Sequence, residues 1–147
     1  PLSIGGSTST LTVEGLKQQP AGKRQADFFL VSPSFFGTLD IPLVAGRLFA
    51  GETSPQKLAV VNETLVRRLF DGRNPIGQRV RSGDDSYEIV GVVKDTKSRT
   101  YGEAPRGILY RQLSQDLSRD AGFLGFTLIA QAPASALPAL RQMIRSV

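Results

Sequence analysis

The stretch from Leu58 to Lys94, LAVVNETLVRRLFDGRNPIGQRVRSGDDSYEIVGVVK, carries the strongest local signals of secondary structure in the chain. Its first four residues, 58–61, are an apolar run short enough for a strand that is buried on both faces. Further strands are expected near residues 76–81 and 87–93, and the polar turn at 82–85 joins them as a hairpin. The stretch therefore predicts a buried strand that is followed, after a connecting segment, by a hairpin.

The connecting segment has the pattern of a short amphipathic helix. Asn62 stands where an N-cap belongs, because its side-chain oxygen can accept an unpaired backbone N–H of the first turn. Gly72 is available for a left-handed C-cap. One face of the helix is apolar at helical spacing, with Leu65, Val66, Leu69 and Phe70.

The composition is that of a globular domain with few side chains suited to catalysis. The 147 residues include 18 basic and 13 acidic side chains, which gives a formal net charge of +5, and they include no Cys and no His. Lack of Cys removes disulfides and thiolate sites, and lack of His removes the commonest base at neutral pH and the commonest metal ligand. The basic residues are dispersed along the chain, so a solvated surface is favoured over nucleic-acid binding, which would show steeply salt-dependent affinity.

Outside this stretch the chain has the pattern of strands with a few short helices between them. Strands are expected over residues 7–15, 26–31, 107–113 and 123–131, and an extended arm is expected over 41–49. Ser32 and Pro33 are expected to begin a short helix as its N-cap and first helical residue, and Ser135 is expected to cap a last helix. This order lacks regular alternation of strand and helix, and it predicts an α+β fold with a mixed sheet.

Three groups of polar residues could carry chemistry, and each has a structural alternative. Asp84, Asp85 and Glu88 could form a metal or acid–base site, but two aspartates in a turn with glycine are usual hairpin chemistry. Without His or Cys, a serine of the segment 32–34 could act as a nucleophile only with a buried, deprotonated lysine, for which Lys94 is the candidate. The polar loop that follows the last predicted strand of the stretch could contact a partner protein through Lys94, Asp95, Lys97, Arg99 and Tyr101.

Six short segments carry a resemblance to a known family, and they occur in the family's order. They are 31–39 (VSPSFFGTL), 41–47 (IPLVAGR), 60–63 (VVNE), 67–70 (RRLF), 74–79 (NPIGQR) and 88–95 (EIVGVVKD). Together they resemble the extracytoplasmic periplasmic core domain of MacB-like ABC transporter permeases. Residues 1–2 and 13–15 are most similar to the second such domain of large duplicated bacterial permeases.

The resemblance implies an α+β domain with two lobes. A porter-like lobe would comprise approximately residues 1–48 and 107–147, and an inserted lobe approximately 49–106. The chain begins at Pro1 without Met, and the resemblance implies that the N-terminal part of the domain is missing.

The same resemblance implies a non-catalytic domain on the periplasmic, extracytoplasmic face of the bacterial inner membrane. Flanking transmembrane helices would anchor it, a cytoplasmic ATPase would drive it indirectly, and a second permease copy or an adaptor protein would be further partners. No cofactor, metal or nucleic acid is expected. The alternative is a soluble small-ligand-binding domain or a Ser–Lys hydrolase on the same scaffold, which an enclosed pocket around Lys94 and a serine would favour.

Overall fold

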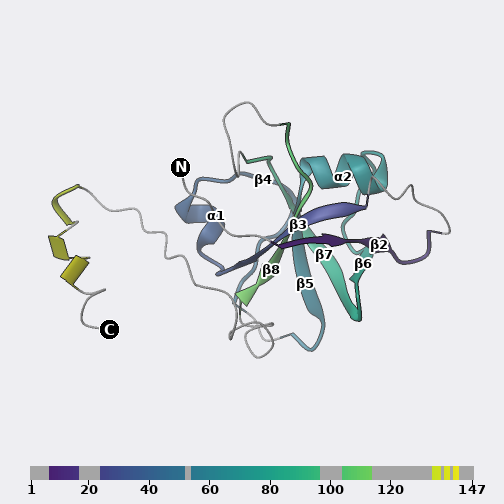
Figure 1. The fold of residues 1–147 in the computed structure, drawn as a ribbon, viewed down its shortest axis with the longest axis horizontal. Coiled ribbons are helices and arrows are strands. Elements are labelled where there is room, and N and C mark those ends of the chain that lie inside the picture. The colour runs from purple at the N-terminus through teal and green to yellow at the C-terminus, as the bar shows by residue number, and fades with distance from the viewer. Residues whose placement is uncertain are drawn as a thin grey trace.

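An eight-stranded mixed sheet with short helices forms the body of the molecule in the computed structural model (Figure 1). The structure describes residues 7–16, 24–51, 54–96, 104–113, 134–136, 138–139 and 141–142. The strands are β1 (Ser7–Thr10), β2 (Thr12–Val13), β3 (Gln25–Val31), β4 (Leu43–Gly46), β5 (Lys57–Asn62), β6 (Arg79–Ser82), β7 (Asp85–Val93) and β8 (Ile108–Gln112). The helices are α1 (Phe35–Thr38), α2 (Glu63–Phe70) and the 3₁₀ turn η2 (Ala134–Ala136). The predicted α+β class is confirmed.

The sheet closes on itself through one continuous segment of chain. Its strand order is β1-β3-β8-β5-β7-β6-β2, and β4 pairs with β7 outside this order. β1 and β2 stand at opposite ends of the order, yet only the buried residue Leu11 separates them in the chain. The Leu11 N–H donates to Arg24 O at 2.7 Å, and the Glu14 N–H donates to Arg79 O at 2.9 Å, so both pairings continue past the strand ends. The predicted strand over 7–15 is thus two strands that bond to different neighbours.

Polar side chains tie together the seam where this segment meets β6 and β7. The hydroxyl oxygens of Ser9 and Ser82 are 3.0 Å apart, and Ser86 Oγ donates to Glu14 Oε1 at 2.8 Å. Arg81 Nη2 also donates to Glu14 Oε1, at 3.3 Å. The hydrogen bond from Ser86 is the main cause that lowers the pKa of the Glu14 carboxyl, and Arg81 adds to it. Glu14 therefore joins three strands as a carboxylate.

β5 lies in the middle of the sheet, as its apolar sequence predicts. It runs parallel to β7 on one side and antiparallel to β8 on the other, and Leu58 through Asn62 are all buried. β3 also runs parallel to β8, whereas β6 and β7 form the predicted antiparallel hairpin, with Ser82 paired to Asp85 across a two-residue loop. A strand that is covered on both faces has apolar residues at successive positions instead of alternating polar and apolar ones, and the run 58–61 is apolar throughout.

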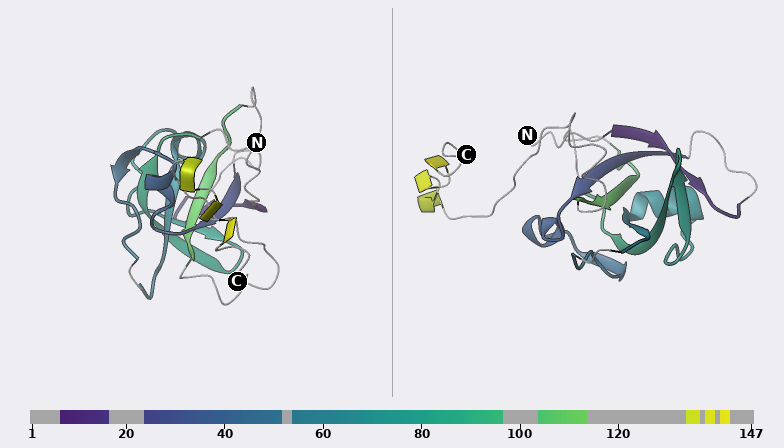
Figure 2. Two further views of the ribbon diagram at one scale, coloured as in Figure 1. Left: turned by 90° about the vertical axis from the view of Figure 1, so that its left-hand side faces the viewer. Right: turned by 90° about the horizontal axis from the view of Figure 1, so that it is seen from below.

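Apolar side chains pack against both faces of the sheet. On one face, α2 places Leu65, Leu69 and Phe70 against β-strand residues such as Val61 and Ile89, and the right-hand view of Figure 2 shows the sheet curving around this helix. On the other face, α1 and the segment 41–49 place Phe36, Ile41 and Phe49 against residues of β3, β5, β7 and β8 such as Tyr110. Full burial of such a side chain contributes roughly 1.5–3 kcal/mol, so both cores stabilise the sheet.

The start of α1 differs from the sequence prediction, whereas the end of α2 agrees with it. α1 begins at Phe35, two residues later than expected, and Ser34 holds the cap position without a side-chain cap bond. Its backbone is in the right-handed helical region (φ −77°, ψ −9°), whereas a capping serine needs an extended backbone, and its hydroxyl lies 3.1 Å from that of Ser32 instead. At the end of α2, Gly72 is left-handed (φ 77°) as predicted, and Asp71 before it is left-handed too (φ 51°), a conformation that aspartate tolerates.

The predicted lobes share the sheet within the described residues. β1 to β4 come from the range 1–48, β5 to β7 from 49–106, and β8 from 107–147, so the predicted boundaries do not coincide with a break in the sheet. The division into two lobes stays a prediction. The strand predicted over 123–131 lies outside the described residues, and of the last predicted helix the structure describes η2 and the helical residues 138–139 and 141–142.

Candidate contact surface

Asn62 joins β5, α2 and the chain that enters β8. Its Oδ1 accepts the Leu65 N–H of the first turn of α2 at 3.1 Å, which confirms the predicted cap. The same oxygen accepts the Ile108 N–H at 2.8 Å, and its Nδ2 donates to Arg106 O at 2.7 Å. The residue is fully buried, so these three bonds satisfy groups that have no access to water. Asn62 is therefore a connection between three elements as well as a helix cap.

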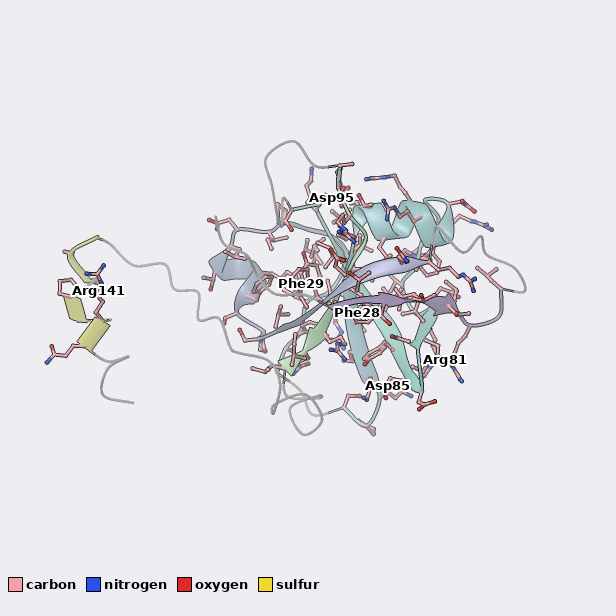
Figure 3. The ribbon with its side chains drawn as sticks, viewed as in Figure 1. Phe28, Phe29, Arg81, Asp85, Asp95 and Arg141 are labelled. Atoms are coloured by element: carbon pink, nitrogen blue, oxygen red, sulfur yellow. The ribbon has the colours of Figure 1, made fainter. Side chains whose placement is uncertain are left out.

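Asp95 binds the same helix end from the other side, where the chain leaves β7 (Figure 3). Its Oδ1 accepts the Thr64 N–H at 2.9 Å, and its Oδ2 accepts Thr64 Oγ1 at 2.8 Å. Arg67 Nη2 donates to Asp95 Oδ2 at 2.9 Å, which makes an ion pair on the surface of α2. A carboxylate at a helix N-terminus is stabilised by the unpaired N–H groups and by the helix dipole.

Asp27 and Arg106 form a further anchor for the chain that enters β8, next to Asn62. Arg106 Nε lies 3.2 Å from Asp27 Oδ2, whose side chain has no exposed surface, and Thr8 Oγ1 donates to Asp27 Oδ1 at 2.9 Å. The Arg106–Asp27 contact is an ion pair without hydrogen-bond alignment, because Oδ2 has no hydrogen-bond partner. The Asp27 N–H donates to Gly107 O at 2.9 Å, so residues 106–108 are bound from both β3 and β5.

Both ends of the connection between β7 and β8 are thus fixed at the N-terminus of α2. Asp95 holds the end that leaves β7, and Asn62 holds the end that enters β8. Between them, Thr96 Oγ1 lies 3.4 Å from the Tyr110 hydroxyl. Burial raises the pKa of Tyr110, and the nearby Asp95 charge adds to the rise. The two described ends of the polar loop predicted as a contact are therefore bonded to residues at the same end of α2.

The structure describes two of the five residues predicted for partner contact. Lys94 is exposed at the end of β7, with its backbone N–H donating to Pro42 O at 3.0 Å, and Asp95 is engaged within the chain as described above. Lys97, Arg99 and Tyr101 lie outside the described residues. Sequence reasoning missed the anchoring role of Asp95, and it assigned one of the three bonds of Asn62. The signal for the rest was that a buried asparagine has a donor and a second lone pair to satisfy.

The other polar candidates occupy ordinary structural positions. Asp85 pairs with Lys57 at 3.0 Å across β5 and β7, and Asp84 is exposed in the hairpin loop. Within the described part of the chain, acidic residues do not gather in threes as a metal site would need. Lys94 is exposed, whereas a Ser–Lys mechanism needs a buried lysine. Among the described helices, none is long and apolar enough to span a membrane.

The fold is similar to those of solved transporter domains. The periplasmic region of MacB from Actinobacillus actinomycetemcomitans aligns with 96% of this chain and 63% of its own, with a TM-score of 0.68 and 20% identity. A domain of a putative permease from Porphyromonas gingivalis aligns with 95% of this chain and 65% of its own (TM-score 0.60, 18% identity). The extracellular domain of the noncanonic ABC-type transporter YknZ from Gram-positive bacteria aligns with 91% and 66% (TM-score 0.59, 12% identity).

Comparison of sequences points to the same kind of transporter domain. The Macrolide export ATP-binding/permease protein MacB of Syntrophobacter fumaroxidans is 29% identical over 79 residues, which is 52% of this chain and 11% of that protein. The profile of the MacB-like periplasmic core domain matches residues 4–147. This family comprises extracytoplasmic domains of transporter permeases and is not a class of enzyme. The chain belongs to the family of MacB-like periplasmic core domains.

Proposed function

We propose that this domain passes the motion of flanking transmembrane helices, driven by a cytoplasmic ATPase, to a substrate or partner protein, and that it does so without catalysis. Membership of the MacB-like family supports the setting in an ABC-type permease. The observation that carries the proposal is the double anchorage at α2, where Asp95 and Asn62 hold both ends of one polar connection. A loop with a rigid base transmits displacement of the sheet to whatever it touches.

Within this proposal, the segment 49–106 is the inserted lobe that carries the loop, and 1–48 with 107–147 is the porter-like lobe nearer the membrane. Lys94, Lys97, Arg99 and Tyr101 make the contact, and Asp95 holds its base. The three cations suit a protein surface that offers carboxylates, because opposite charges attract across an interface. Arginine and tyrosine are also enriched at interface hot spots. The partner is an adaptor protein or the second permease copy.

The experiment uses the parent transporter reconstituted in membrane vesicles, with ATP hydrolysis and transport measured on the same preparation. The double variant Lys97→Glu/Arg99→Glu is expected to reduce transport by about tenfold, because charge reversal at a contact weakens association, while ATP hydrolysis continues. Unaltered transport, or equal loss of both activities, would contradict the proposed coupling.

A matched control has its charge reversal away from the loop. Arg73 is suitable, because its side chain is 77% exposed and its ion pair with Asp71 is long, at 3.7 Å. Arg73→Glu is expected to leave transport and ATP hydrolysis unchanged. Sequencing beyond both ends of the 147 residues tests the setting separately, since the proposal requires membrane-spanning segments on the flanks.

A further inference from the structure

β4 presents an apolar edge to solvent. All four of its residues are exposed, with 43% of Leu43 and 47% of Val44 accessible. It pairs antiparallel with β7 through Leu43 and Val93 and through Gly46 and Gly91, with an irregularity between Leu43 and Ala45. Exposed apolar edge strands are rare in stable monomers because their free backbone groups pair with other chains.

The backbone of β4 offers its unpaired groups outward. Pro42 O accepts the Lys94 N–H at 3.0 Å, and the Arg47 N–H donates to Val90 O at 2.9 Å, so residues 42 and 47 turn their backbone groups towards β7. Backbone groups alternate in direction along an antiparallel strand. Because the C=O and N–H of a trans peptide point in opposite directions, the Leu43 N–H and the Gly46 C=O face the outer side, where an added strand would bond.

Two glycines fix this edge in place before any partner arrives. A Cβ on Gly91 would overlap the carbonyl oxygen of Arg47, so β4 can approach β7 closely only because residue 91 has no side chain. Gly46 has φ +72°, a left-handed conformation that favours glycine, and it ends the strand next to Arg47. The edge is preformed, and binding to it needs little reorganisation.

An exposed cation lies at each end of the edge. Lys94 is bonded through its backbone to Pro42 at one end, and Arg47 follows Gly46 at the other, where its Nη1 also donates to Leu48 O at 3.3 Å. Asp40 precedes the segment, in the turn that ends α1. The two cations, with apolar side chains between them, match an extended segment that is apolar in the middle and acidic at its ends.

We propose that the outer edge of β4 binds such an acid-flanked apolar segment of a partner protein, which adds one strand to the sheet. Strand addition draws affinity from backbone hydrogen bonds and specificity from alternate side chains. A second copy of this chain fits less well: antiparallel self-pairing would set residue 42 of one copy opposite residue 47 of the other, which brings Lys94 and Arg47 together as like charges. The surface shares Lys94 with the loop contact proposed above, but it does not use Lys97, Arg99 or Tyr101, and it does not depend on that contact.

The test uses the 147-residue chain and a synthetic probe, the acetylated and amidated peptide Glu-Val-Thr-Val-Thr-Val-Glu. Titration followed by amide NMR is expected to shift the signals of β4, and hydrogen exchange of the Leu43 amide is expected to slow. A second peptide with Lys at both ends, and a third with Pro in place of the central Val, are expected to bind about tenfold more weakly. Equal binding of the three peptides, or shifts confined to other elements, would overturn the proposal.

Variants of the protein make the test reciprocal. Arg47→Glu/Lys94→Glu is expected to reverse the preference, so that the Lys-flanked peptide binds about tenfold more tightly than the Glu-flanked one. Leu43→Pro removes an outward N–H, leaves the bond to Pro42 intact, and is expected to abolish binding while circular dichroism stays unchanged. Lys97→Glu/Arg99→Glu is expected to keep the peptide affinity, which separates this surface from the loop. Concentration-dependent dimers that Leu43→Pro dissolves would overturn the proposal in favour of a second copy.

Discussion

The two helices that pack on the sheet begin at similar polar sequences but are held by different forces. α2 begins after Asn62, whose extended backbone (φ −91°, ψ 165°) aims its side chain at the Leu65 N–H. α1 begins after Ser34, whose helical backbone offers no cap bond. α1 is held instead by Phe36, which is fully buried with its ring centroid 5.0 Å from that of Tyr110 and 6.1 Å from that of Phe49.

The difference shows that capping depends on the backbone conformation that the neighbouring residues impose, as well as on the type of side chain. Asn62 follows a buried strand, so the backbone that reaches it is extended, and β8 and the chain that enters it supply one further partner each, Ile108 and Arg106. Ser34 follows Pro33 in a turn, and its hydroxyl meets Ser32. Polar bonds therefore fix the start of α2 in addition to its apolar packing, whereas the start of α1 depends on apolar packing alone.

Truncation of the aromatic contact of α1 is expected to have the largest effect. Phe36→Ala removes a buried ring from the core between α1 and the sheet, and it should lower the free energy of unfolding by about 4 kcal/mol. Urea unfolding followed by circular dichroism measures this. Phe35→Ala, at a half-buried position in the same helix, should lower it by about 2 kcal/mol. Equal losses at the two positions would contradict the packing described here.

Removal of the cap of α2 is expected to have the next largest effect. Asn62→Ala leaves the Leu65 and Ile108 N–H groups and the Arg106 carbonyl without their partner, and it should cost about 3 kcal/mol. Ser34→Ala should cost less than about 0.5 kcal/mol, because no cap bond is lost. A third variant, Asn74→Ala, loses an exposed bond to the Ile76 N–H and should cost about as little. If Ser34→Ala matched Asn62→Ala, the contrast between the helices would fail.

The second anchor of α2 should matter less, because it is nearer to solvent. Asp95→Ala removes bonds to Thr64 and the ion pair with Arg67, and it should lower the free energy of unfolding by about 1.5 kcal/mol. Asp71→Asn is the control, since asparagine also tolerates the left-handed backbone of this position (φ 51°) and the change removes only the exposed ion pair with Arg73 at 3.7 Å, so it should have almost no effect. Denaturation of both variants at low and high salt separates the ionic part, which salt weakens.

The smallest expected effect depends on pH and concerns the aromatic cluster around α1. Burial raises the pKa of Tyr110 in the folded protein, so its contribution to stability is complete below the ordinary tyrosine pKa of about 10 and is lost as the pH rises above that value. Tyr110→Phe should reduce this alkaline loss while changing stability at neutral pH by less than about 1 kcal/mol. Unfolding at increasing pH tests the difference, and identical alkaline profiles for the two proteins would contradict it.

The sequence predicted the parts of the fold that depend on near neighbours. The buried strand at 58–61, the amphipathic helix behind Asn62 and the β6–β7 hairpin follow from apolar period, cap type and turn residues within a few positions of one another. The helix start at Ser32 was wrong, because Ser-Pro-Ser fits both a cap and a turn, and the backbone angle of Ser34 decides between them. The family resemblance, carried by six ordered segments, is confirmed.

Only the tertiary structure decided how distant residues complete these elements. Thr64 and Asp95 are 31 positions apart, and Asn62 and Ile108 are 46 apart, so no local pattern could show that both ends of one connection meet at the start of α2. The closing of the sheet by the segment 7–13 and the exposed edge of β4 likewise depend on which strands become neighbours. The sequence by itself determined the type of each element in the stretch 58–94, because propensity and capping act over one or two turns. The tertiary structure decided the anchors and the free edge through the pairing of strands, because hydrogen bonds form between groups that are close in space, however far apart they are in the chain.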